Sequence, residues 1–247
     1  MTIRLKCLAP RPMARTRLLC VPFAGAGAGA YRGWADALPA HVETYAVQLP
    51  AREDRLGEAP YARWRPMMEA LTAAVAALPM QPTVLFGHSL GALIAFELAR
   101  WMQAQRPATP RHLFVSGRPW PGGGDAHAHG AAALSDEALL EALDRRYGSL
   151  ATSLSHPEIR ELVAPILRAD VALLDSYAYQ TGAPLDCPIT MLAGRDDPTT
   201  PPDQTDGWRH ETRAAFASHV LEGGHFFIEA QRKRVLEIVG AALPVPG

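Results

Sequence analysis

The chain has 247 residues, of which 48% are hydrophobic and 20% are charged; this excludes an intrinsically disordered protein and allows one large core. Its 24 basic and 25 acidic residues give a formal net charge of −1, which argues against nucleic-acid binding through a basic field. The sequence contains no apolar run as long as a signal peptide or a membrane span, so we expect a cytoplasmic protein without membrane association.

The chain is predicted to begin with strands at residues 4–8 and 17–23, followed by a loop of alternating alanine and glycine. Gly25, Gly27 and Ala30 match the dinucleotide-binding pattern G-x-G-x-x-A, which also needs an acidic residue near the end of the next strand. That strand carries Glu43 at its start instead. The alternative is an oxyanion loop, in which small residues let a backbone N–H face a reacting carbonyl, and Ala24 is the expected donor.

The functional prediction depends on a motif in the middle of the chain. An apolar run at 84–86 ends at Gly87-His88-Ser89-Leu90-Gly91, and a helical apolar pattern follows. The five residues match G-x-S-x-G between a strand and a helix, where glycine-sized neighbours permit the tight turn that presents a nucleophilic serine. Ser89 is therefore the predicted nucleophile. The N–H of Leu90 is expected to join that of Ala24 in the oxyanion hole, and His88 is expected to fill space.

Further strands at 112–116 and 189–194, alternating with helices, predict a mostly parallel, doubly wound α/β sheet. We expect one domain, residues 1–247. Residues 118–184 interrupt the alternation with a loop and two helical patterns, 135–147 and 157–177. The second pattern places Ile159 and Leu162 on an apolar face. An insertion of this length predicts a lid over the site, and a purely structural flap is the alternative.

Two partners for Ser89 are predicted in the C-terminal third. Asp197 follows the strand at 189–194, and its neighbour Asp196 is assigned to a turn cap. His225 follows a short strand and two glycines, just before the last helix at 228–243. The chain order serine, aspartate, histidine is that of a hydrolase triad. Ser89, His225 and Asp197 are thus the predicted nucleophile, base and orienting acid.

Metal chemistry is not predicted. His127 and His129 form an H-A-H pair, but the further aspartate and histidine partners of a two-metal site do not follow at the required positions. The three cysteines, Cys7, Cys20 and Cys187, have no metal-ligand spacing, and the last two lie in or beside apolar runs where buried thiols are expected.

Four segments together resemble the stand-alone type II thioesterases of nonribosomal-peptide and polyketide synthesis, which belong to the α/β-hydrolase superfamily. They are residues 20–27 (CVPFAGAG), 48–55 (QLPAREDR), 87–91 (GHSLG) and 223–227 (GGHFF). The second is much more specific than the serine pentapeptide. Phe23, Ala26 and Ala51 stand where the family commonly has histidine, glycine and glycine. None of these departures affects the triad, but Phe23 leaves the acyl preference open.

The resemblance implies a monomeric editing enzyme that hydrolyses acyl thioesters held on the phosphopantetheine arm of acyl or peptidyl carrier proteins, without a cofactor of its own. Arg52, Arg55, Arg145 and Arg146 are candidates for a basic rim that attracts acidic carriers. One alternative is a carboxylesterase or acyl-CoA thioesterase that acts on free small substrates with the same triad. Another is a non-catalytic binding protein on a hydrolase scaffold, against which the complete set of triad residues argues.

Overall fold

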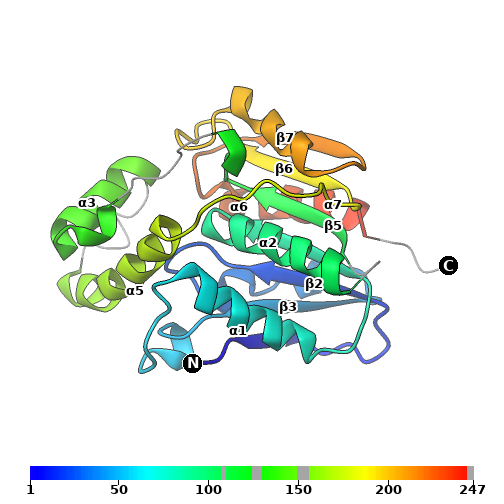
Figure 1. Cartoon of the computed structure of the whole chain (residues 1–247), viewed down its shortest axis with the longest axis horizontal. Helices are drawn as coiled ribbons and strands as arrows, with labels where there is room; N and C mark the ends of the chain where they lie inside the picture. Colours follow the sequence, from blue (N-terminus) through cyan, green and yellow to red (C-terminus); the bar gives the residue numbers. More distant parts are fainter. Residues whose placement is uncertain (107–109, 124–129, 149–155, 244–247) are drawn as a thin grey trace.

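The computed structural model describes residues 1–106, 110–123, 130–148 and 156–243. Within these residues, seven strands form one sheet in the order β1-β3-β2-β4-β5-β6-β7 (Figure 1). β1 is antiparallel to β3, and every other pair is parallel. The strands are β1 (Arg4–Ala9), β2 (Thr16–Val21), β3 (Val42–Gln48), β4 (Thr83–His88), β5 (Pro110–Ser116), β6 (Ile189–Gly194) and β7 (Phe216–Leu221). The predicted α/β-hydrolase type of fold is confirmed.

The central strands form because both of their faces are buried. β2, β4 and β6 contain buried residues only, as expected for parallel strands covered by helices on both sides. Leu19 and Leu85 point into one core, whereas Leu18 and Phe86 point into the core on the opposite face. Because successive side chains of β4 alternate between the two cores, the register of this strand, which leads into Ser89, is fixed.

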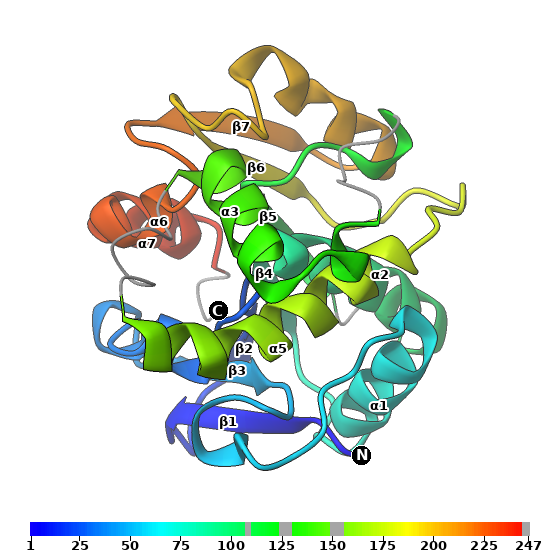
Figure 2. The same cartoon turned by 90° about the vertical axis from the view of Figure 1, so that its left-hand side faces the viewer.

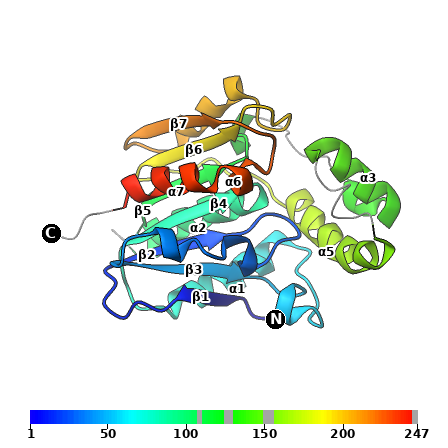
Figure 3. The ribbon, with the colours of Figure 1, turned by 180° about the vertical axis from the view of Figure 1, so that it is seen from behind.

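Helices cover both faces of the sheet (Figures 1 and 3). α1 (Trp64–Ala76) and α2 (Leu90–Gln105) lie on one face. The 3₁₀ turns η1 (Ala28–Tyr31) and η2 (Ala35–Ala37) lie on the other with α6 (Phe227–Ala230) and α7 (Arg232–Ala241). The last helix, expected at 228–243, is interrupted at Gln231 between α6 and α7. No helix in the described ranges is long and apolar enough to span a membrane.

The described helices of the insertion at 118–184 lie across the carboxyl ends of the central strands (Figure 2). Its elements include η4 (Pro121–Gly123), η5 (Ala131–Ala133), α3 (Asp136–Tyr147) and α5 (Pro157–Asp175). The hydroxyl of Ser135 accepts a hydrogen bond from the N–H of Ala138 at 3.2 Å and caps α3, as its sequence predicts. Another 3₁₀ helix, η6 (Pro202–Glu211), follows β6.

α5 joins the insertion to the main domain. Its last turns carry Leu173 and Leu174 into the main core, and Leu167 packs in a small separate core with α3. Ile159 and Leu162, which the sequence places on the apolar face of this helix, are exposed, with exposed fractions of 39% and 51%. The helical period places these residues on an apolar face, but the core shared with α3 begins one turn later, at Ala164.

Half-buried His112 is expected to make the folded protein less stable in acid. Its Nε2 lies 2.8 Å from Thr190 Oγ1, and burial lowers its pKa from 6.5 to about 4. Between these values the unfolded chain binds a proton that the folded chain does not, so the free energy of unfolding falls as the pH is lowered, by at most about 1.4 kcal/mol per pH unit. We expect His112→Gln to lose less stability than the wild type between pH 7 and pH 4.5. Urea unfolding at several pH values measures the difference, and parallel losses would contradict the prediction.

Candidate active site

Ser89 occupies a sharp turn between β4 and α2. Its φ of +55° lies in the left-handed region, which non-glycine residues rarely adopt. A Cβ on Gly87 would lie 2.1 Å from the carbonyl oxygen of Gly91, and a Cβ on Gly91 would lie 2.1 Å from that of Val21. Both glycines are therefore required by close backbone contacts, which gives the G-x-S-x-G match its physical basis.

The three predicted triad residues meet although they are far apart in sequence. Ser89 Oγ lies 3.0 Å from His225 Nε2, and His225 Nδ1 lies 2.8 Å from Asp197 Oδ2. Asp197 follows the carboxyl end of β6 and His225 follows that of β7, so the parallel strands deliver both side chains to one edge of the sheet. All three residues are buried, with Ser89 the most exposed at 7%. This is the hydrogen-bonded order of a serine nucleophile, its base and an orienting acid.

Thr199 fixes the aspartate and was not predicted from the sequence. Its backbone N–H and its hydroxyl donate to Asp197 Oδ1 at 2.9 and 2.7 Å, which leaves Oδ2 for the histidine. Burial raises the pKa of Asp197, but hydrogen bonding and charge attraction from His225, together with the Thr199 bonds, lower it more, and the net pKa is below 3.8. Asp196, by contrast, is exposed. The D-x-T spacing of a local side-chain turn was the available signal.

His88 packs beneath the triad. It is completely buried, its ring centroid is 5.1 Å from that of His225, and its Nδ1 lies 2.9 Å from Ser116 Oγ. Burial holds the pKa of His88 well below its usual value, so the ring is neutral and adds no positive charge beside His225. These contacts agree with the space-filling role expected for it.

The glycine-rich loop is held by side chains of the protein itself. The N–H groups of Ala28 and Gly29 donate to Gln48 Oε1 at 2.6 Å and Glu53 Oε1 at 2.7 Å. In a dinucleotide site such N–H groups would face a pyrophosphate. Here a carboxylate occupies that position and would repel the phosphates, so the geometry disfavours the dinucleotide hypothesis.

Both candidate oxyanion donors lie next to the serine. Ala24 lines the same small pocket as Ser89. Leu90 is the first residue of α2, where backbone N–H groups have no acceptor within the helix. A negative charge that develops above Ser89 would therefore lie close to a helix N-terminus and to the loop after β2.

The insertion covers the serine. A cavity of about 40 Å³ contains Ser89 and is bounded on the insertion side by α3 and α5. Tyr147, at the end of α3, has its ring centroid 4.4 Å from that of His225. The pocket lining is otherwise apolar, which suits an acyl chain; it consists of Phe23, Ala24, Leu143, Tyr147, Leu167, Val171, Leu174 and Phe226 in addition to Ser89 and His225. Tyr147 and Phe226 were not predicted as pocket residues, because their helical or loop context gives no such signal.

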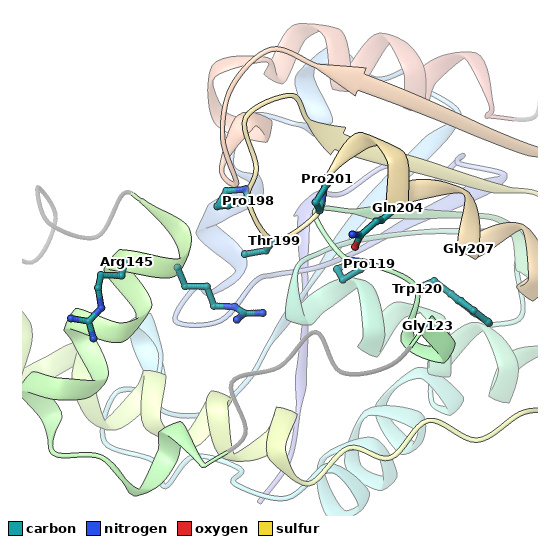
Figure 4. Close-up of a pocket in the computed structure, with 10 residues that line it drawn as sticks. Pro119, Trp120, Gly123, Arg145, Pro198, Thr199, Pro201, Gln204 and Gly207 are labelled. Atoms are coloured by element: carbon teal, nitrogen blue, oxygen red, sulfur yellow. The ribbon is translucent and has the colours of Figure 1, made fainter.

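A second cavity of about 610 Å³ begins at Thr199, beside the triad (Figure 4). Arg145 and Arg146 of α3 line one side of it, and Trp120 and Gln204 line another. The indole N–H of Trp120 donates to Glu211 Oε1 at 2.7 Å, which fixes this wall. The cavity is large enough for an extended, partly polar ligand.

The predicted basic rim must be corrected. Arg52 and Arg55 are buried, at 3% and 2% exposure, because Arg52 pairs with Asp170 and Arg55 pairs with Glu58 and donates to the carbonyl oxygens of Gln48 and Thr2. Arg145 remains exposed, and it lies on the large cavity with Arg146.

The described part of the chain holds no group of three histidine, cysteine or acidic residues that could bind a metal. His127 and His129 lie outside the described residues. Cys20 and Cys187 are buried free thiols, as expected.

Comparison with known proteins gives concordant matches. Residues 16–243 match the thioesterase domain family. The chain is 36% identical over 244 residues to linear gramicidin dehydrogenase LgrE of Brevibacillus parabrevis, covering 96% of this chain and 91% of that protein. RedJ, a thioesterase from the prodiginine pathway of Streptomyces coelicolor, superposes with a TM-score of 0.86 at 36% identity over 95% of this chain and 88% of RedJ. BorB, the type II thioesterase of the borrelidin cluster, gives a TM-score of 0.84 at 34% identity over 97% of each chain.

Proposed function

Because this chain belongs to the thioesterase domain family, we propose that it hydrolyses acyl thioesters presented on the phosphopantetheine arm of carrier proteins in nonribosomal-peptide or polyketide synthesis. The observation that carries the catalytic part is the chain of contacts from Ser89 through His225 to Asp197. The assignment of a carrier-bound substrate is supported by similarity to RedJ, a thioesterase of the prodiginine pathway, and to BorB, a type II thioesterase of the borrelidin cluster.

In the proposed mechanism, His225 accepts the Ser89 proton while Oγ attacks the thioester carbonyl. The N–H groups of Ala24 and Leu90 donate to the oxyanion. His225 then gives its proton to the departing thiolate, and the carbon–sulfur bond breaks. Water, deprotonated by His225, attacks the acyl-serine carbonyl. His225 returns this proton to Ser89 Oγ as the bond from the acyl carbon to Oγ breaks, which releases the acid and restores the serine. Asp197 holds the imidazole in the required tautomer, and its low pKa keeps it ionised. No step requires a cofactor.

We assign residues 118–184 as the lid of a single catalytic domain. α3 and α5 form the roof of the 40 Å³ cavity at Ser89, so any acyl chain of several carbons requires this roof to shift. The large cavity beside Thr199 is the proposed passage for the arm, with the acyl group at Ser89 and the carrier outside Arg145 and Arg146.

If an acidic carrier protein docks outside the large cavity, the positive charges of Arg145 and Arg146 should promote its binding. Arg145→Glu with Arg146→Glu should raise KM for an acidic acyl-carrier substrate by about tenfold, because rim charges mainly affect encounter with the partner. kcat/KM for the same acyl group on N-acetylcysteamine should change little. Arg65→Glu on α1, where the side chain is 90% exposed, is the matched control. Equal effects of both substitutions on the carrier substrate would contradict this entrance.

The proposed substrate class is tested by offering one acyl chain on a phosphopantetheinylated carrier, on coenzyme A and as an oxygen ester. The carrier substrate should have the highest kcat/KM. Equal or better use of the oxygen ester would support a general esterase with the same triad.

A further inference from the structure

A buried carboxylate joins the lid to the oxyanion loop. Asp170 belongs to α5 and is completely buried. Its Oδ2 accepts a hydrogen bond from the backbone N–H of Gly25 at 2.7 Å, and both of its oxygens contact the guanidinium of Arg52. The triad does not use this carboxylate.

The bond from Gly25 to Asp170 lies beside the proposed oxyanion hole. Gly25 follows Ala24 directly, so the bond from its N–H fixes the peptide plane next to the proposed oxyanion donor. Gly25 has a φ of +81°, and a Cβ on it would lie 2.9 Å from Leu167 Cδ2 of α5. The loop and α5 are thus in contact through both the carboxylate and the apolar side chain.

Arg52 pairs with Asp170 and is itself held by the backbone. Ala51 and Glu53 on either side have φ values of +65° and +51°, which turn the Arg52 side chain inward. Its Nη1 donates to the carbonyl oxygen of Pro50 at 2.8 Å, and its own carbonyl accepts from Gln48 Nε2 at 2.9 Å. The strained segment is therefore built to place one guanidinium against one carboxylate.

We propose that Asp170 is a positioning residue, which holds the Gly25 amide and thereby aims the Ala24 N–H at the oxyanion, while Arg52 supplies the charge that keeps this carboxylate buried. The inference rests on the proposed function. It also makes the C-terminal half of α5 a fixed part of the site, so that lid opening takes place in α3 and the first turns of α5.

Two double variants test the positioning role without leaving a buried charge. Arg52→Met with Asp170→Asn keeps an oxygen that can accept from Gly25 N–H. In Arg52→Met with Asp170→Leu, the leucine is similar in size to asparagine but has no oxygen that can accept from Gly25 N–H. We expect kcat to be at least about tenfold lower in the second variant than in the first, with similar KM, because a misplaced oxyanion donor weakens the transition state selectively. Affinity for an alkylboronic acid, which forms a tetrahedral adduct on serine, should fall in parallel.

The single variant Asp170→Asn is a less direct test, since it leaves Arg52 buried without its partner and lowers stability. Thermal unfolding of both double variants should show equally folded proteins. Equal kcat values and equal boronate affinities in the two folded variants would overturn the positioning role. Failure of the wild type itself to hydrolyse thioesters would instead overturn the proposed function, so the two failures are distinguishable.

Discussion

Replacing Ser89 with alanine is expected to lower kcat for thioester hydrolysis by about 10⁵- to 10⁶-fold, the loss typical of a missing triad nucleophile. The hydroxyl is the atom within 3.0 Å of His225 Nε2, and alanine supplies no group that can form the acyl-enzyme. Alanine keeps the Cβ, so the turn with its φ of +55° should be retained. Substrate affinity and thermal stability should therefore remain close to those of the wild type.

Steady-state kinetics of purified Ser89→Ala measure this loss, with Ser218→Ala on β7 as the control. The hydroxyl of Ser218 donates to Thr205 Oγ1, which is not a triad residue. Its substitution should therefore change kcat less than about threefold. Turnover by Ser89→Ala within tenfold of the wild type would show that another group is the nucleophile.

Asp197→Asn is expected to lower kcat by about 10⁴-fold with little change in KM. Asparagine preserves the shape of the side chain but presents an amide to His225 Nδ1, which favours the tautomer that cannot accept the serine proton. The loss of charge also removes the stabilisation of the imidazolium formed during acylation. Kinetics with a small thioester substrate measure the effect without a contribution from carrier docking.

Asp196→Asn is the matched control for this substitution. Asp196 is adjacent in sequence and exposed, so its change should leave kcat within about threefold. A larger loss in Asp196→Asn than in Asp197→Asn would contradict the assignment of the orienting acid.

The sequence predicted the triad because each residue follows a recognisable strand in the parallel sheet. Gly87 is required by the backbone of Gly91 in the same turn, whereas Gly91 is required by the carbonyl oxygen of Val21 at the end of the neighbouring strand β2. Both glycines belong to the G-x-S-x-G pattern, which is recognisable in the sequence without knowledge of the second contact. Asp197 and His225 follow from strand ends and chain order. The strand ends and the turn at Ser89 are each recognisable from a few consecutive residues, which is why the sequence placed all three triad residues.

The positions of Arg52 and of the lid residues could not be predicted in the same way. Arg52 appears in a charged loop, but the positive φ of Ala51 and Glu53 turns it toward Asp170, which is 118 residues away in sequence. Such a pairing depends on the packing of α5 against the loop. Tyr147 likewise reaches His225 only because α3 crosses the strand ends. Tertiary contacts decide these positions, and no local pattern specifies them.

Labelling with a fluorophosphonate, followed by peptide mass spectrometry, measures whether Ser89 is the activated nucleophile. We predict one label per chain on the peptide that contains Ser89, with activity lost in proportion to labelling and no label on Ser89→Ala. Full thioesterase activity in completely labelled protein, or inactivation by a label on a different residue, would show that Ser89 is not the nucleophile.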